Sequence, residues 1–274
     1  MNKLSIEKRS QIVQLLVEGN SLRSTSRITG TSINTVSKLL VDVGTACYKF
    51  HKETVKGIAS KRVQCDEIWS FVYAKEKNKK EGEWGKGDVW TWVGIDADTK
   101  LVIDFYVSDR SAGAAYFFMK GVAERLSNRI QLTTDGHHTY LDAVRETFGN
   151  NIDYAQLVKI YGGADGSQIS ERKYSPSKFT TAAKKTRIGN PDLQHTSTSY
   201  VERQNLTMRM GMRRFTRLTN AFSKKFENHC YAIALHFVYY NFCRIHKTLR
   251  VTPAMEAGLT KRVMDIRDLV MFTR

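Results

Sequence analysis

The sequence predicts an α/β protein with a helical segment at each end. Apolar residues recur at helical spacing through the first 45 residues, β-branched and aromatic residues dominate residues 63–107, and helical and strand-like patterns then alternate up to residue 160. A chain of 274 residues can form about two domains at roughly 150 residues each. We expect the boundaries to separate residues 1–45, a basic linker at 46–62, a central domain at 63–220 and a helical region at 221–274.

Three serines predict the starts of three short helices near the amino terminus. Ser5, Ser21 and Ser32 each stand before an apolar pattern of helical period, and Gly19 and Gly30 stand where the first two helices would end. Two helices joined by such a tight turn form a helix-turn-helix, whose last helix enters the major groove of DNA. A three-helix bundle without any DNA contact fits the same pattern. The expected DNA contacts are Arg23, Arg27, Asn34, Thr35 and Lys38.

The central segment carries the pattern of a sheet with crossing helices. Expected strands are Val63–Tyr73, Val89–Ile95, Leu101–Val107, Ile130–Thr134 and Ala155–Ile160. A helix should begin after Ser111 and another should cover Tyr140–Phe148, while Lys75–Gly87 and Tyr161–Pro191 are expected to be long loops. This order is compatible with an α/β layer that carries its active site at strand ends.

The carboxyl-terminal region predicts an amphipathic helix over Ser223–Ile245, which could pack on the core or on another protomer, with the core favoured. Its apolar stretch, Tyr231–Cys243, contains His236 and Asn241 and is too short to cross a bilayer. The first ten residues lack the apolar run of a secretory signal. The four cysteines include no Cys-x-x-Cys pair, so reduced thiols in the cytoplasm, without a membrane partner, are expected.

The composition indicates a globular protein with a polyanionic partner. Hydrophobic residues make up 41% and charged residues 26%, which excludes a disordered chain, and the formal net charge is +16. Residues 1–62 and 151–274 are basic, whereas residues 63–150 are slightly acidic. We therefore expect the flanks to hold nucleic-acid phosphates and the centre to need carboxylates. Uneven solubility charge is the plainer explanation of the same pattern.

Two aspartates stand at positions that suggest a functional carboxylate. Asp66 lies inside the apolar run VQCDEIWSFV, where burying a charge is costly unless it is paired or bound to a metal. Asp135 ends an expected strand in the sequence TTDGHHTY, where a carboxylate can meet a ligand. Aspartate also starts turns and caps helices, which is the structural alternative for both residues.

Glu202 is isolated among basic residues. It is the only acidic residue between Asp192 and Glu227. On a helix, Arg209 and Arg213 would share its face, whereas an apolar stripe would lie on another face. The apolar face of this helix would then pack against the protein, and the other face would carry Glu202 and the arginines. A solvated basic helix, with Glu202 in weak intrahelical ion pairs, is the alternative.

Together these motifs resemble a known family. Asp66 in CDEIWSFV, Asp135 in TTDGHHTY and Glu202 in SYVERQNLTMRMGMRRF, separated by 69 and 67 residues, resemble the DDE triad of bacterial insertion-sequence transposases, in the family named for insertion sequence one. The resemblance implies a ribonuclease-H-like mixed sheet flanked by helices and two Mg²⁺ ions, replaceable by Mn²⁺, held by the triad. It also implies a bacterial, nucleoid-associated protein. Members often carry a cysteine zinc finger ahead of the helix-turn-helix, and this sequence does not.

The resulting hypothesis is a transposase that nicks transposon ends and joins the 3′-hydroxyl to target DNA by two-metal-ion phosphoryl transfer. Its substrates would be terminal inverted repeats and target duplex, bound by at least a dimer. His138 is added to the triad as a catalytic candidate, and the candidate strand contacts are Arg203, Arg209, Arg213, Arg214 and Arg217. Alternatives are an inactive, domesticated DNA-binding regulator and a ribonuclease-H-like nuclease without strand transfer. A recombinase using Tyr140 or Tyr200 is less favoured, because such a tyrosine needs a cluster of activating basic residues.

Overall fold

The centre of the molecule is a mixed sheet of six strands in the part of the chain that the structure describes. This structure is a computed structural model and describes residues 3–83, 85–161, 179–216 and 220–273. The strands are β1 (Arg62–Val72), β2 (Gly87–Asp96), β3 (Val102–Ser108), β4 (Gln131–Asp135), β5 (Asp153–Tyr161) and β6 (Phe179–Ile188), in the order β3-β2-β1-β4-β5-β6. β1, β2 and β3 are antiparallel, β4 and β5 run parallel to β1, and β6 is antiparallel to β5. The predicted ribonuclease-H-like mixed sheet is confirmed.

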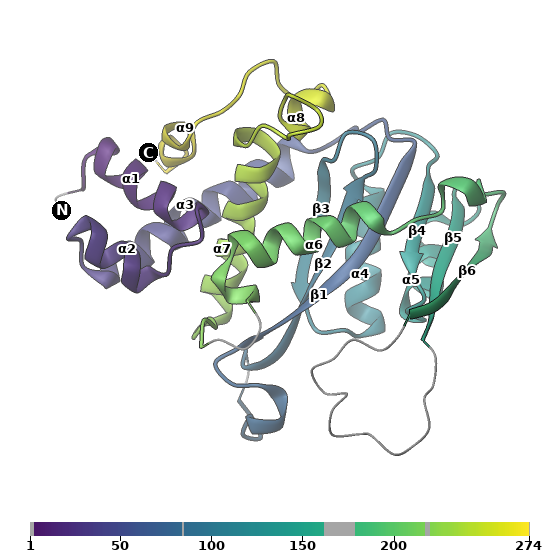
Figure 1. Ribbon diagram of the computed structural model, residues 1–274, viewed down its shortest axis with the longest axis horizontal. Helices are drawn as coiled ribbons and strands as arrows, with labels where there is room; N and C mark the ends of the chain where they lie inside the picture. The colour runs from purple at the N-terminus through teal and green to yellow at the C-terminus, as the bar shows by residue number, and fades with distance from the viewer. Residues whose placement is uncertain (1–2, 84, 162–178, 217–219, 274) are drawn as a thin grey trace.

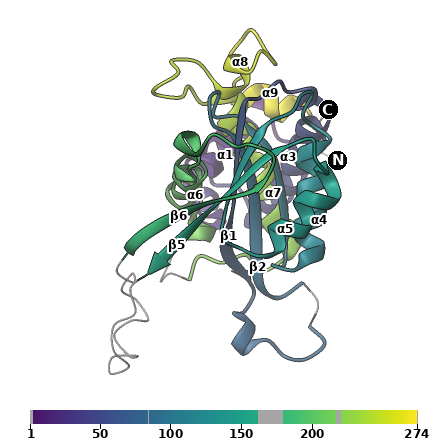
Figure 2. The ribbon, with the colours of Figure 1, turned by 90° about the vertical axis from the view of Figure 1, so that its right-hand side faces the viewer.

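Helices cover both faces of this sheet (Figures 1 and 2). On one face, α4 (Ala112–Ala123) and α5 (Thr139–Phe148) bury Phe118 and Tyr140 against Trp92 of the sheet. On the other face, α6 (Ser199–Gly211) and α7 (Phe226–Val238) pack with Ile68 and Val93. Because side chains alternate along a strand, β1 sends Asp66 toward α6 and Glu67 toward α5.

The amino-terminal helices are α1 (Ile6–Val17), α2 (Leu22–Thr29) and α3 (Ile33–Thr54). Their caps are the predicted ones, since the side chains of Ser5, Ser21 and Ser32 each accept a hydrogen bond from a backbone N–H of the first turn. Gly30 adopts a φ of 65° at the turn between α2 and α3, a conformation that glycine adopts without strain.

Helix α3 is longer than expected and joins the amino-terminal helices to the rest of the fold. Residues 46–54, expected to belong to a linker, are helical, and Cys47 and His51 in them are buried. A Cβ atom added to Gly44 would lie 2.5 Å from the Cβ and backbone oxygen of Tyr231, so only glycine permits this approach of α3 to α7. Packing against α7 therefore extends α3 beyond the predicted boundary.

The carboxyl-terminal region is helical but more broken than predicted. α7 ends at Val238, a π-helical turn covers Tyr239–Cys243, and α8 (Pro253–Glu256) and α9 (Ile266–Met271) follow. α7 packs against α3 and the sheet of the same chain, as favoured. Short 3₁₀ turns cover Glu76–Asn78, Leu193–His195 and Arg213–Phe215. Within the described residues, no helix combines the length and apolar character needed to span a membrane.

The prediction of a long loop over Tyr161–Pro191 is wrong for residues 179–188, which form strand β6. Its sequence, FTTAAKKTRI, contains threonines, alanines and three basic residues instead of a clear apolar alternation. β6 forms because its backbone pairs with β5, from Tyr154↔Ile188 to Tyr161↔Phe179. Pairing with a neighbour, which a local pattern does not contain, decides this element.

Candidate active site

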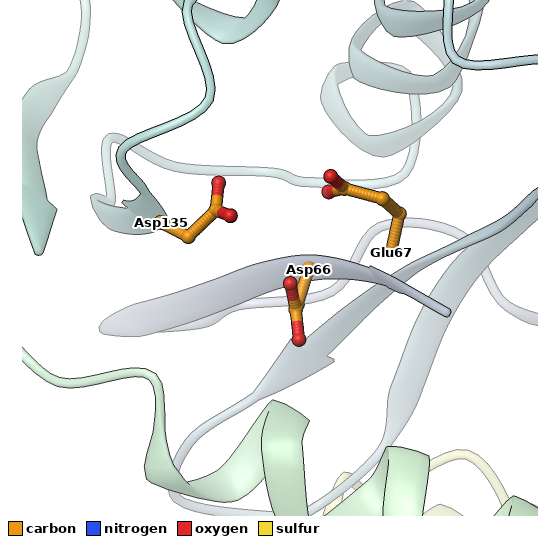
Figure 3. Close-up of side chains that lie close together, drawn as sticks. All are labelled: Asp66, Glu67 and Asp135. Carbon is orange, nitrogen blue, oxygen red and sulfur yellow. The ribbon is translucent and has the colours of Figure 1, made fainter. Parts of the chain in front are cut away.

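The register between β1 and β4 brings Asp66 and Asp135 together. The two strands are parallel, and Cys65 pairs with Thr134, one residue before each aspartate. β4 ends at Asp135, whereas β1 continues to Val72. Beyond the end of β4, oxygen atoms of Asp66, Asp135 and Glu67 all lie within 4.8 Å of one another (Figure 3). We call these three residues the carboxylate cluster.

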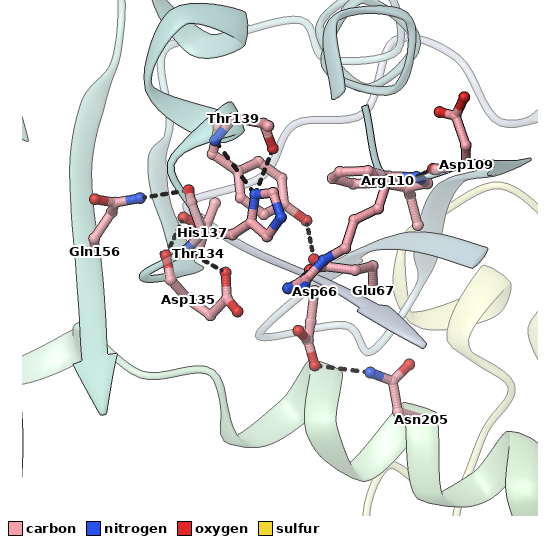
Figure 4. Close-up of polar contacts among 12 residues, drawn as sticks. Asp66, Glu67, Asp109, Arg110, Thr134, Asp135, His137, Thr139, Gln156 and Asn205 are labelled. Carbon is pink, nitrogen blue, oxygen red and sulfur yellow. Dashed lines mark hydrogen bonds and ion pairs between the residues drawn. The ribbon is translucent and has the colours of Figure 1, made fainter. Parts of the chain in front are cut away.

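Asp66 points toward α6, and its charge is poorly solvated. Its Oδ2 accepts a hydrogen bond from Nδ2 of Asn205 at 2.8 Å (Figure 4). Burial raises the pKa of Asp66 to about 8, and the neighbouring charges of Glu67 and Asp135 act in the same direction. A carboxylate in this position is stable when it holds a proton or a cation.

Asp135 is held at the start of the turn into α5. Its Oδ1 accepts a hydrogen bond from the backbone N–H of His137 at 3.0 Å. The ring of His137 lies 2.6 Å from Oγ1 of Thr139 through Nδ1 and stacks on the ring of the exposed His138, with 5.0 Å between centroids. The catalytic candidate His138 therefore lies beside the carboxylate cluster and outside it.

Glu67 was missed by the sequence analysis. Its side chain is 1% exposed and turned to the face opposite Asp66. Oε2 accepts a hydrogen bond from the hydroxyl of Tyr140 at 3.0 Å, and Oε1 accepts one from Nε of Arg110 at 2.8 Å. The sequence does contain a signal for it, since Glu67 directly follows Asp66 in CDEIW. Neighbouring residues of a strand point to opposite faces, so a second acid beside Asp66 is expected on the other face of β1.

Glu202 lies on α6, one helical turn before Asn205, and does not join the carboxylate cluster. Its Oε1 lies 2.5 Å from Nζ of Lys159 on β5 and accepts a hydrogen bond from Oγ1 of Thr198 at 2.5 Å. The structure thus brings two of the three predicted carboxylates together and places the third on the neighbouring helix, in an ion pair.

Gln64, also missed by the sequence analysis, fixes α6 over β1. Its Oε1 accepts hydrogen bonds from the backbone N–H groups of Tyr200 and Val201 at 2.8 and 3.2 Å. These are two of the unpaired donors at the start of α6. Gln64 precedes Asp66 by two residues on the same face of β1, so the contact aligns the helix that carries Glu202 with the strand that carries Asp66.

The predicted DNA contacts differ in their exposure. The five predicted contacts on α2 and on the first turns of α3 are all exposed, namely Arg23, Arg27, Asn34, Thr35 and Lys38. Arg203 and Arg213 are accessible to solvent and Arg209 is half-buried. Arg214 is turned inward, since its Nε donates a hydrogen bond to Oγ of Ser223 at 2.7 Å and burial lowers its pKa to about 10. Arg217 lies outside the described residues.

The donor set of the carboxylate cluster fits a divalent cation. Mg²⁺ and Mn²⁺ prefer oxygen ligands, and all three side chains offer carboxylate oxygens. The raised pKa values of Asp66 and Glu67 come from burial and from the other acids. A cation would remove this repulsion, so the electrostatics as well as the ligand type fit a metal.

Replacement of Asp66 by asparagine should stabilise the metal-free protein at alkaline pH. The folded-state pKa is about 8 and the ordinary value is 3.8. Between these values the folded chain binds a proton that the unfolded chain has released, so wild-type stability falls as pH rises from about 4 to about 8. The asparagine side chain binds no such proton. In chelator, thermal unfolding at pH 8.5 should show a gain of about 2–6 °C for Asp66→Asn, with little difference at pH 4. If the unfolding temperatures of the wild type and of Asp66→Asn change with pH in parallel, the raised pKa of Asp66 is contradicted.

Comparisons with known proteins give structural neighbours only. No family model and no curated protein matches the chain. A piggyBac transposase synaptic complex with hairpin DNA is similar over 98% of this chain and 69% of its own, with 10% identity and a TM-score of 0.44. A Mos1 strand transfer complex has 13% identity and a TM-score of 0.26 over 87% of this chain and 76% of its own. A Mos1 paired-end complex with the left transposon end has 12% identity and a TM-score of 0.24, over 56% of this chain and 60% of its own.

Proposed function

We propose that this chain is a DDE-type transposase that nicks transposon ends and joins the freed 3′-hydroxyl to target DNA. The observation that carries the proposal is the carboxylate cluster, in which Asp66 and Asp135 meet at the end of β4 within a ribonuclease-H-like sheet. α6, with Glu202, lies against the same Asp66 through Asn205. The resemblance of these three motifs to the family named for insertion sequence one supports the same activity.

Asp66, Asp135 and Glu202 would hold the divalent cations, Mg²⁺ or Mn²⁺. When bound, such ions stabilise the charge on a phosphate undergoing displacement and activate the attacking oxygen. The residues around the cluster orient the ligands. The Asn205 amide directs Oδ2 of Asp66, and the backbone N–H of His137 directs Oδ1 of Asp135. For Glu202 to reach the cluster, its carboxylate has to exchange Lys159 for the cation.

The charge distribution supports double-stranded DNA as the substrate. The formal net charge is +16, and the basic side chains on α2, α3 and the outer face of α6 are accessible to solvent. Phosphate contacts from these residues would position the duplex, while Asn34 and Thr35 would meet base edges. Joining two transposon ends requires two active sites, so at least a dimer would assemble on DNA.

The test is incubation of the full chain with labelled duplex from the genomic DNA on both sides of its coding sequence, with Mg²⁺, Mn²⁺ or chelator. We expect metal-dependent nicks at the element ends and, with pre-cut ends, products joined to target plasmid. Nicks without joined products would indicate a nuclease. Binding without any nick would indicate a regulator and would overturn the proposal.

Affinity for DNA should fall steeply with salt and depend on the amino-terminal helices. Each neutralised phosphate contributes about −0.9 to the slope of log affinity against log salt. For the double variant Arg23→Ala/Arg27→Ala we expect a slope less steep by about 2, measured by fluorescence anisotropy with a duplex of about 30 base pairs. Lys77→Ala/Lys80→Ala, in the turn after β1, removes the same charge and is the control. An unchanged slope for Arg23→Ala/Arg27→Ala would exclude α2 from the interface.

A further inference from the structure

Arg110 lies in the turn between β3 and α4, beside the carboxylate cluster (Figure 4). Its Nε donates to Oε1 of Glu67 at 2.8 Å, and one terminal nitrogen lies 2.5 Å from the same oxygen. The guanidinium carbon stands 4.6 Å from the centre of the Trp90 ring. A carboxylate on one side and an aromatic face on another therefore fix this cation next to Asp66 and Asp135.

The Glu67 side chain is buried and holds the Arg110 guanidinium in place. Its side chain is 1% exposed, whereas that of Arg110 is 39% exposed. Oε2 of Glu67 is bound by the hydroxyl of Tyr140, which is fully buried between α5 and the sheet. Both carboxylate oxygens thus accept hydrogen bonds from protein donors. The buried end of the pair is therefore held by protein contacts, and the accessible end is the guanidinium.

We infer that Arg110 is a catalytic residue that contacts the scissile phosphate and that Glu67 is the positioning residue that holds it there. The inference rests on the proposed function. A guanidinium has five N–H donors in a planar fork, and the contacts to Glu67 use two of them. Three donors are left for the phosphate that the carboxylate cluster would engage. Arginine fits phosphate oxygens in a bidentate manner, and a fixed donor stabilises the charge that develops during displacement.

A purely structural role predicts something different. If Arg110 only neutralised the buried charge of Glu67, removing both charges together would restore activity. The double variant Glu67→Gln/Arg110→Ala tests this. The glutamine side chain of this variant still accepts a hydrogen bond from Tyr140 and leaves no unpaired buried charge, so the double variant should fold even where Arg110→Ala alone does not.

The experiment measures single-turnover nicking of the end-containing duplex at saturating protein and Mg²⁺. We expect Arg110→Ala and the double variant to lose about 10²-fold in rate. Arg110→Lys should recover part of this loss, because it retains the charge and loses the fork. Arg129→Ala is the matched control, since Arg129 is 43% exposed and pairs with Asp153 at the opposite end of β4. We expect it to keep the wild-type rate.

Two further readouts separate the possible failures. In the double variant, Mn²⁺ binding measured by calorimetry should stay within about threefold of wild type, because the proposed ligands Asp66, Asp135 and Glu202 are unchanged and both oxygens of Glu67 already accept hydrogen bonds from protein donors. DNA binding measured by anisotropy should also stay within about threefold, because only one of many phosphate contacts is removed. A double variant that nicks at the wild-type rate, or that loses activity only through weaker Mn²⁺ binding, overturns the assignment of Arg110. Absence of nicking by the wild-type chain instead counts against the proposed function.

Discussion

Asp135→Asn should lower the rate of metal-dependent nicking by about 10³-fold or more. A carboxylate that binds a divalent cation contributes both a ligand and a negative charge, and the asparagine amide lacks the charge. The shape of the side chain is kept, and the amide oxygen of the variant can still accept the hydrogen bond from His137 that Asp135 accepts. Asp66→Asn should have an effect of the same size. Single-turnover rates with the end-containing duplex are the measurement.

Two controls make this result specific to the carboxylate cluster. Asp142→Asn changes an exposed acid on α5, outside the cluster, and should leave the rate unchanged. Affinity of Asp135→Asn for the same duplex in chelator should match or exceed that of the wild type, because a negative charge near the DNA is removed. Nicking by Asp135→Asn at the rate of Asp142→Asn would remove Asp135 from the proposed catalytic residues.

The sequence predicted the aspartates because both carry a local signal. Asp66 interrupts an apolar strand, and Asp135 ends one. Their meeting depends on the parallel register of β1 and β4, which a ribonuclease-H-like sheet implies. Strands β1 to β5 were predictable for a similar reason, since β-branched and aromatic residues mark them. β6 was not, because its polar sequence forms a strand only by pairing with β5.

The residues that organise the site carried no comparable signal. Each of these residues is held by a contact that is distant in the sequence: Gln64 binds the start of α6, Asn205 binds Asp66 on β1, and Arg110 binds Glu67. A single sequence does not reveal contacts between residues that lie far apart in it. The length of α3 could not be predicted for the same reason, since its second half is stabilised by packing on α7 and not by its own composition.

Glu202→Gln should lower nicking by about 10²-fold or more, although Glu202 pairs with Lys159 and lies outside the carboxylate cluster. α6 is tied to β1 at Gln64 and at Asp66, so Glu202 has a fixed helix beside the cluster and only its side chain has to turn. In the proposed site the Lys159 ammonium would compete with the cation for this carboxylate. Rates at saturating Mg²⁺ are the measurement, and a wild-type rate for Glu202→Gln would show that Glu202 serves only its ion pair.

The competition itself can be measured with Lys159→Met. Exposed ion pairs contribute up to about 1 kcal/mol, which corresponds to about fivefold in an equilibrium constant. Lys159→Met should therefore lower the Mg²⁺ concentration for half-maximal nicking by about two- to fivefold, while the rate at saturating Mg²⁺ stays similar. Lys184→Met, on the neighbouring strand β6 and bonded to the backbone oxygen of Leu193, is the matched control. If both variants need as much Mg²⁺ as the wild type, Glu202 does not exchange Lys159 for the cation, and another carboxylate has to complete the site.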